Sequence, residues 1–151
     1  MNKNIILSII VLAVIFVSCD KEDVDSTKPT IEVVEPHHLD EFMPGEFIPI
    51  NVIFRDNVEL KEYKVDIHYN PDGHAHGRIL ATEAGWSHTF SDKFDPGKKE
   101  VTINITIEIP EKVGDADIAH GEYHIGIYCT DASNNESVEF IEIHIEEEED
   151  H

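Results

Sequence analysis

Residues 121–146 read GEYHIGIYCTDASNNESVEFIEIHIE, and two alternating runs within this stretch decide the fold class. The apolar residues of these runs occupy every second position: Tyr123, Ile125, Ile127 and Cys129 in the first, then Ile141, Ile143 and Ile145 in the second. A period of two puts them on one face of a strand. Residues 132–135 form a cluster of turn-forming residues between the runs. The stretch therefore predicts an antiparallel hairpin with one buried face.

Working outward, five earlier stretches are also expected to be strands. They are residues 30–35, 47–54, 61–70, 86–90 and 101–109. No stretch shows a sustained helical period. About seven strands at regular spacing, separated by polar turns, predict an all-β fold: an immunoglobulin-like antiparallel β-sandwich spanning residues 29–147. In such a sandwich the third, sixth and seventh strands lie side by side in one sheet.

The chain has 151 residues and is strongly acidic, with 32 acidic against 11 basic residues and a formal charge of −21. This charge should repel nucleic acid and anionic membrane surfaces, so neither is an expected direct partner. Cations are attracted by the same field. The terminal residues 148–151 are interpreted as a solvated acidic tail.

The N-terminus carries a targeting signal. Lys3 precedes an apolar run over residues 5–17, which is too short to span a bilayer as a stable helix. The run ends in Phe-Val-Ser-Cys at residues 16–19, which resembles the bacterial lipoprotein signal box. The resemblance implies cleavage after Ser18 and lipidation of Cys19, with a signal peptide at residues 1–18. A signal peptide without lipidation is the alternative.

Residues 19–28 are expected to form an acidic linker behind the anchor. The sequence Asp-Lys-Glu-Asp at residues 20–23 looks like the surface-export signal of Bacteroidota lipoproteins. The resemblance implies a lipid-anchored protein of the outer membrane, exposed at the cell surface, with other outer-membrane proteins as candidate partners. An ordinary acidic tether on the periplasmic side is the alternative. With Cys19 lipidated, Cys129 has no disulfide partner and is expected to be a small buried core residue.

Histidine is concentrated in residues 63–78, YKVDIHYNPDGHAHGR, which contain His68, His74 and His76. Neutral imidazole is the commonest protein ligand for transition metals near pH 7. A polar loop that happens to be rich in histidine is the other interpretation of this tract.

Two histidines in the final hairpin strengthen the metal hypothesis. Pairing Thr130 with Val138 would set His124 opposite His144, on the face away from the isoleucines. The third strand runs antiparallel to the sixth, so His68 should lie near His124 on that face. The predicted metal ligands are therefore the histidines at five positions: His68, His74, His76, His124 and His144.

Several imidazoles without a thiolate favour an open site for Zn²⁺ or Cu²⁺, with Ni²⁺ also suited. Asp66 and Asp72 are candidates to orient the ligating rings by hydrogen bonds. The four histidines treated as surface residues are His37, His38, His88 and His120. Calcium is a weaker alternative, in which Asp56, Asn57, Asp131 and the asparagines at 134 and 135 would supply oxygen ligands.

Two further stretches carry a resemblance to a known family. Residues 54–60, FRDNVEL, look like the start of the third strand of bacterial Ig-like modules. Residues 121–124 and 130–136 look like their penultimate strand and final turn. Four short segments that contain histidine, at residues 67–68, 72–74, 76–77 and 123–124, complete the pattern. The whole pattern resembles a family of Bacteroidota lipoproteins classified as a domain of unknown function. This resemblance covers nearly all of residues 29–147 and implies the same fold, but no activity.

No nucleophile motif, phosphate loop or dinucleotide fingerprint is present in the sequence. We therefore expect a binding protein and not an enzyme. The first hypothesis is a lipoprotein that captures or hands over a transition-metal ion. The second is an adhesion or interaction module that binds a protein or a glycan through its Ig-like surface.

Overall fold

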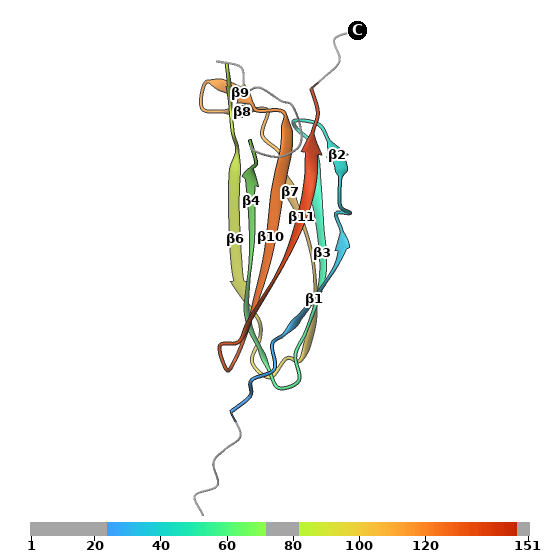
Figure 1. Cartoon of the computed structure of the whole chain (residues 1–151), viewed down its shortest axis with the longest axis vertical. Coiled ribbons are helices and arrows are strands. Elements are labelled where there is room, and N and C mark those ends of the chain that lie inside the picture. The colour runs from blue at the N-terminus through green and yellow to red at the C-terminus, as the bar shows by residue number, and fades with distance from the viewer. Residues whose placement is uncertain (1–23, 72–81, 148–151) are drawn as a thin grey trace, which may run out of the picture.

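Within residues 24–71 and 82–147, which the computed structural model describes, every regular element is a β-strand (Figure 1). Two sheets pack face to face. The sheet of order β1-β3-β7 contains β1 (Thr30–Glu35), β3 (Phe47–Arg55) and β7 (Glu100–Glu108). The sheet of order β2-β11-β10-β4-β6 contains β2 (Asp40–Phe42), β11 (Glu136–Ile145), β10 (Gly121–Asp131), β4 (Leu60–Tyr69) and β6 (Ser87–Lys93). The predicted immunoglobulin-like sandwich is confirmed.

Seven strands of six or more residues build the two layers, as the sequence pattern predicts. Four short strands were not expected: β2, β5 (Glu83–Ala84), β8 (Lys112–Val113) and β9 (Ala116–Ile118). Runs of two or three residues are too short to show a period. The short β2 extends the large sheet by pairing in parallel with β11, and β5, β9 and β8 form a small third sheet.

The core fills the space between the two large sheets. Alternate residues of β3 are fully buried: Ile48, Ile50, Val52 and Phe54. Those of β4 and β10 face them from the opposite sheet, including Val65, Ile67, Ile125 and Ile127. Cys129 is also fully buried and free, as predicted. The pleat that turns these residues inward turns the intervening polar residues outward, which is what creates the candidate site.

Tyr123 ties the start of β10 to the loop before it. Its buried hydroxyl donates a hydrogen bond to the carbonyl oxygen of Ala119 at 2.7 Å. Such a tyrosine corner is typical of immunoglobulin-like sandwiches. Trp86, which immediately precedes β6, packs against the same ring with 6.2 Å between centroids. The backbone nitrogen of Trp86 also donates to the Tyr123 hydroxyl at 3.5 Å, so this hydroxyl links the loop before β10 to the start of β6.

In the described part of the chain, no helix is long and apolar enough to cross a membrane.

Candidate metal centre

The outer face of the large sheet carries two rows of polar side chains near the end where β4 finishes and β10 begins, called here the upper end (Figure 1). In the first row His68 of β4 pairs directly with His124 of β10, and His124 pairs on its other side with Glu142 of β11. The rings of His68 and His124 lie 5.6 Å apart, edge to face. The predicted neighbourhood of these two histidines is confirmed.

His144 belongs to the second row. Its partner on β10 is Glu122, and its partner on β2 is Glu41. The predicted register, with His144 opposite His124, is wrong by two residues, because Thr130 pairs with Glu136 and not with Val138. The turn is tighter than expected. Asp131 accepts hydrogen bonds from the backbone and side-chain nitrogens of Asn135 at 2.8 and 2.7 Å, closing the loop early.

Two of the three histidines are oriented by carboxylates. Nδ1 of His68 lies 3.2 Å from Oδ2 of Asp66, and Nδ1 of His144 lies 2.7 Å from Oε1 of Glu146. An ionised carboxylate only accepts, so each Nδ1 carries a proton, and in the neutral form of each ring Nε2 keeps its lone pair. This is how metal-binding histidines are usually held. Asp66 is itself fixed by the hydroxyl of Thr89, which donates to Oδ1 at 2.8 Å.

His144 has a second feature of a ligand. Its Nε2 is buried and has no hydrogen-bond partner, and the same is true of Oε2 of Glu122, the residue directly opposite. Buried polar atoms are normally paired, so an unpaired nitrogen and oxygen on facing residues call for a common partner. The sequence pattern could not identify Glu122, because acidic residues are frequent throughout this chain.

His124 is differently placed. Its Nε2 lies 2.9 Å from Nδ2 of Asn70 and 3.2 Å from Oε1 of Glu142. This nitrogen accepts from the amide when unprotonated and donates to the carboxylate when protonated. A metal at this nitrogen would displace the Asn70 contact.

His38 lies closer to the rows than the sequence indicated. Its Nε2 is 3.7 Å from Oε2 of Glu142, and His38, His124, Phe140 and Glu142 line one shallow hollow of the surface. His38 is a surface residue, as expected, and the parallel pairing of β2 with β11 brings its loop beside the hairpin.

The other three histidines make separate contacts. His37 is exposed and lies 3.6 Å from Asp40. His88 pairs with the inward-facing Ile67 and packs near Trp86, so it lies on the other face of the sheet. His120 lies 3.2 Å from Glu83. The predicted site residues His74, His76 and Asp72, and the predicted lipidation site Cys19, lie outside the described residues.

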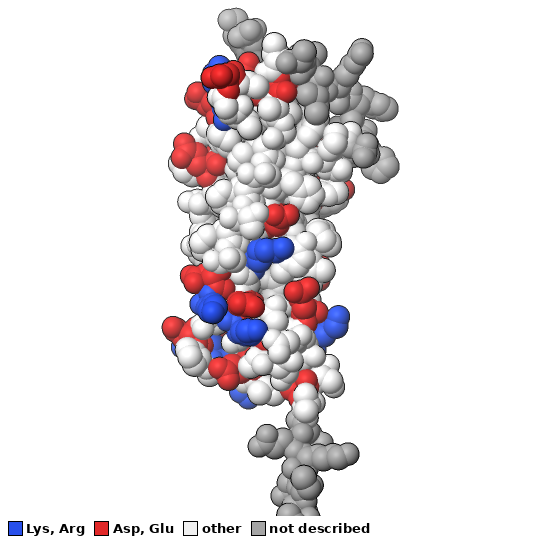
Figure 2. Space-filling model, turned by 90° about the vertical axis from the view of Figure 1, so that its left-hand side faces the viewer, with Lys and Arg blue, Asp and Glu red and all other residues white. Residues whose placement is uncertain are grey.

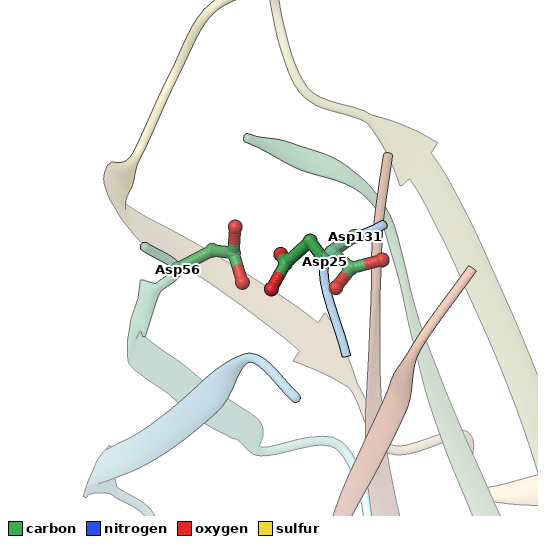
Figure 3. A group of neighbouring side chains, drawn as sticks. All are labelled: Asp25, Asp56 and Asp131. Carbon is green, nitrogen blue, oxygen red and sulfur yellow. The ribbon is translucent and has the colours of Figure 1, made fainter. Parts of the chain in front are cut away.

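A second group of potential ligands lies at the opposite, lower end of the sandwich. Asp25, Asp56 and Asp131 each offer one carboxylate oxygen, and these atoms lie within 4.8 Å of one another (Figure 3). The sequence indicated Asp56 and Asp131 as calcium ligands, but Asp25 was missed. Asp25 lies in the acidic segment before β1, and no periodic pattern distinguishes it from its acidic neighbours.

The lower half of the large sheet also has an aromatic surface. Tyr128 and Phe140 meet edge to face at 6.1 Å, and Nζ of Lys64 lies 3.9 Å from the centre of the Tyr128 ring. A Cβ on Gly126 would lie 2.9 Å from Tyr128 and 3.1 Å from Phe140, so glycine is required for both rings to lie across the strand. Lys64 and Tyr128 also line a neighbouring cleft of about 630 Å³.

Figure 2 shows that positive side chains on the face it presents gather mainly in the lower half, mixed with acidic ones, with one more near the top. The lining of the cleft has the same mixture: Lys64 and Lys93 alternate with Glu62 and Asp92. Such a surface offers hydrogen-bond donors and acceptors as well as aromatic area.

The model of the family "Domain of unknown function (DUF4625)" matches residues 17–146. The chain belongs to this family. The match confirms the resemblance to a domain family of unknown function, while the assignment to Bacteroidota stays a prediction. No curated protein matches the DUF4625 chain.

Solved structures similar to this DUF4625 domain share its fold. Wild-type OgpA from Akkermansia muciniphila matches with a TM-score of 0.51 and 18% identity, over 80% of this chain and 30% of OgpA. Catalytically inactive OgpA in complex with an O-glycopeptide substrate, glycodrosocin, matches with a TM-score of 0.50 and 17% identity, over 84% and 32%. The DUF4625 chain thus spans about a third of the length of these structures. At this identity the similarity concerns the fold alone.

Proposed function

We propose that this DUF4625 protein is a lipid-anchored, surface-exposed module that binds a transition-metal ion through histidines on the outer face of its large sheet. Zn²⁺ and Cu²⁺ are the ions that best suit imidazole with one or two carboxylates. The role is capture or transfer of the ion, without catalysis. The lipid anchor is the one implied by Cys19.

One observation carries the proposal: three outward-facing histidines occupy adjacent rows of paired strands, and the Nε2 of one of them, His144, is buried without a hydrogen-bond partner. His68 and His124 are direct cross-strand partners. His144 is one row further, with its Nε2 buried and unpartnered. His124 and His144 are diagonal neighbours on adjacent strands, about 7–8 Å apart at their backbones, whereas His68 lies one strand further from His144. We propose that an ion bound by His124 draws in one or both of the other rings. His74 and His76 follow β4 within a few residues and are proposed as additional ligands.

Calorimetric titration of Zn²⁺ and Cu²⁺ into the protein from residue 20 onward tests this proposal. The core lies between Ile31 and Ile145, so this fragment retains it. His68→Ala and His144→Ala should each weaken binding at least tenfold, in line with the loss of one ligand from a small set. His37→Ala is the matched control, because the His37 side chain is exposed and its ring nitrogen lies beside Asp40. Equal affinities for all three variants would show diffuse surface binding and would reject the organised site.

The alternative is an adhesion or interaction module that binds a glycan or protein without a metal. The observation in its favour is Phe140, which is 60% exposed and meets Tyr128 edge to face. Aromatic rings exposed on a flat sheet offer apolar area that is rarely left uncovered without a partner. Screening glycans and glycopeptides with wild-type protein and Phe140→Ala, in the presence of a chelator, separates this alternative from the metal proposal.

A further inference from the structure

The acidic group at the lower end is assembled from three separate segments of the chain. Asp25 precedes β1, Asp56 follows β3 and Asp131 ends β10. Asp131 is fully buried, and one oxygen from each side chain lies within 4.8 Å of the others. Three negative charges this close, partly shielded from water, repel one another strongly unless a cation lies between them.

Hydrogen bonds satisfy both oxygens of Asp131 but only one oxygen each of Asp25 and Asp56. Oδ2 of Asp56 accepts from the backbone nitrogens of Val58 and Glu59 at 2.8 and 2.7 Å. Oδ1 of Asp25 accepts from the backbone nitrogen of Thr27 at 3.0 Å and from the side chain of Asn57 at 3.1 Å. These bonds fix both carboxylates in orientation and lower the pKa of Asp25, chiefly through Thr27, so that it stays ionised.

Two carboxylate oxygens of the cluster have no hydrogen bond, and they are the evidence for a ligand. Oδ2 of Asp25 and Oδ1 of Asp56 each expose less than 1 Å² and accept no hydrogen bond. A desolvated carboxylate oxygen without a partner is costly, and two such atoms in one cluster are unexpected in a stable fold. They belong to a cluster that collects negative charge from three segments, so both are explained if they bind the same cation.

Basic side chains of the described residues do not supply that positive charge. In the described residues, none of the ion pairs includes Asp25, Asp56 or Asp131. The nearby lysines bond elsewhere: Nζ of Lys99 donates to the carbonyl of Asn57, and Nζ of Lys61 donates to Oδ1 of Asn134. An external cation would balance the charge that the described residues leave uncompensated in this cluster.

The donor set selects the cation. All three side chains offer hard carboxylate oxygens, with no imidazole or thiolate. Carbonyl oxygens are also close, because Nδ2 of Asn135 lies 3.1 Å from the carbonyl of Asp25 and 3.3 Å from that of Thr27, as well as 2.7 Å from Oδ2 of Asp131. Two amide protons cannot serve three acceptors, so acceptor capacity is left over. An irregular set of carboxylates and carbonyls from several loops suits Ca²⁺ better than the strictly octahedral Mg²⁺.

We propose that Asp25, Asp56 and Asp131 bind Ca²⁺, and that the ion clamps the segment before β1 to the two turns at the base of the sandwich. Only six positions separate Cys19 from Asp25, a reach of about 20 Å when fully extended. If Cys19 is the lipid anchor of the proposed function, bound calcium holds the base of the domain close to the membrane and points the histidine rows away from it.

Calcium titration by calorimetry, on chelator-treated protein from residue 20 onward, tests the site. Wild-type protein should bind Ca²⁺ and melt at a higher temperature with the ion than without it. Asp25→Asn should weaken the affinity at least tenfold and remove the thermal shift. Asp115→Asn is the matched control, because it makes the same charge change at an exposed position in the turn between β8 and β9. Asp131→Asn is avoided as the main variant, since Asp131 also holds its turn.

No thermal shift at millimolar Ca²⁺, or equal affinities for Asp25→Asn and Asp115→Asn, would overturn the calcium site. The clamp is tested separately with a spin label on Val24→Cys, since Val24 is 83% exposed and Cys129 is fully buried. Calcium should slow the label, and an unchanged spectrum despite bound calcium would overturn the clamp. Zn²⁺ affinity should be the same in wild type and Asp25→Asn. A negative result for the calcium site can therefore be distinguished from a negative result for the histidine site.

Discussion

The imidazole rings of His68 and His124 lie directly opposite each other on β4 and β10, with 5.6 Å between their centres. This contact joins residues that are far apart in sequence, and it is held by a nine-pair register between the two strands. The position of the pair is therefore as rigid as the sheet. A metal site that uses this pair would need His124 to exchange its contact with Asn70 for the ion, and it is expected to lose affinity when a ligand is protonated or removed.

The first prediction concerns pH. Zn²⁺ and Cu²⁺ affinity should fall steeply as the pH drops through about 6, because imidazole must be neutral to coordinate. Calorimetry between about pH 5 and pH 8 measures this. Calcium affinity at the lower end should change little over the same range, since carboxylates stay ionised there. A pH-independent Zn²⁺ affinity would contradict the assignment of histidine ligands.

A second prediction separates a ligand from a residue that orients one. Asp66→Asn should weaken metal binding about tenfold, because it removes the carboxylate that holds Nδ1 of His68 but leaves the ligand in place. His38→Ala should also weaken metal binding, because the carboxylate of Glu142 loses its contact with His38 and is then less firmly held beside His124. The loss of affinity should be smaller than for His124→Ala, which removes a ligand. Affinities of the three variants, measured side by side, decide the order. An Asp66→Asn protein that binds like wild type would contradict the orienting role.

A third prediction concerns the tyrosine corner. Tyr123→Phe should lower the free energy of unfolding by about 1–3 kcal/mol, because the buried carbonyl of Ala119 loses its hydrogen-bond donor while the ring stays in place. Urea denaturation followed by Trp86 fluorescence measures the change. Tyr128→Phe is the matched control on the same strand, since the Tyr128 hydroxyl faces the solvent side of the sheet. Equal stabilities of the two variants would show that the corner contributes nothing.

A fourth prediction concerns alkaline pH. Burial raises the pKa of Cys129 from 9.0 to about 12, with Asp56 and Asp131 adding to the effect, and burial raises the pKa of Tyr123 from 10.0 to about 12. Both side chains are neutral when protonated and have a lower pKa in the unfolded chain than in the folded protein. As the pH rises above 9, the unfolded chain therefore loses these protons before the folded protein does. The stability that these groups contribute is complete below pH 9 and is lost between about pH 9 and 12.

Denaturant titrations at pH 8 and pH 10.5 measure this loss. Cys129→Ala should be less stable than wild type at pH 8 but show a smaller drop toward pH 10.5. A thiol reagent at pH 8 should modify wild-type protein only after unfolding, because Cys129 is fully buried. Rapid modification of the folded protein would contradict this.

The last prediction concerns the anchor. Cys19→Ala should release the protein from the membrane fraction, because the lipidated residue is removed. Membrane fractionation and immunoblotting measure the release, with Ser18→Ala as a control that keeps a small residue before the cysteine. Retention of Cys19→Ala in the membrane to the same extent as wild type would reject lipidation at this position.

The sequence alone determined the seven long strands and the inward faces of the most regular ones. Burial of one side of a strand imposes a period of two, so the patterns at residues 101–109 and 121–131 could be read without coordinates. The same period showed that His68, His124 and His144 point away from the core. Local chemistry was enough for these conclusions, because the pleat of a strand depends on nothing distant in the chain.

Only the tertiary structure decided which of these side chains meet. The register of β10 with β11 depends on the hydrogen bonds of Asp131 to Asn135, and a turn two residues tighter than expected moved His144 from the row of His124 to that of Glu122. His38 reached Glu142 through the three-residue strand β2, and Asp25 reached Asp131 across 106 positions of sequence, from 25 to 131. A sequence period carries no information about such contacts, because they arise from how separate segments close on one another when the core is buried.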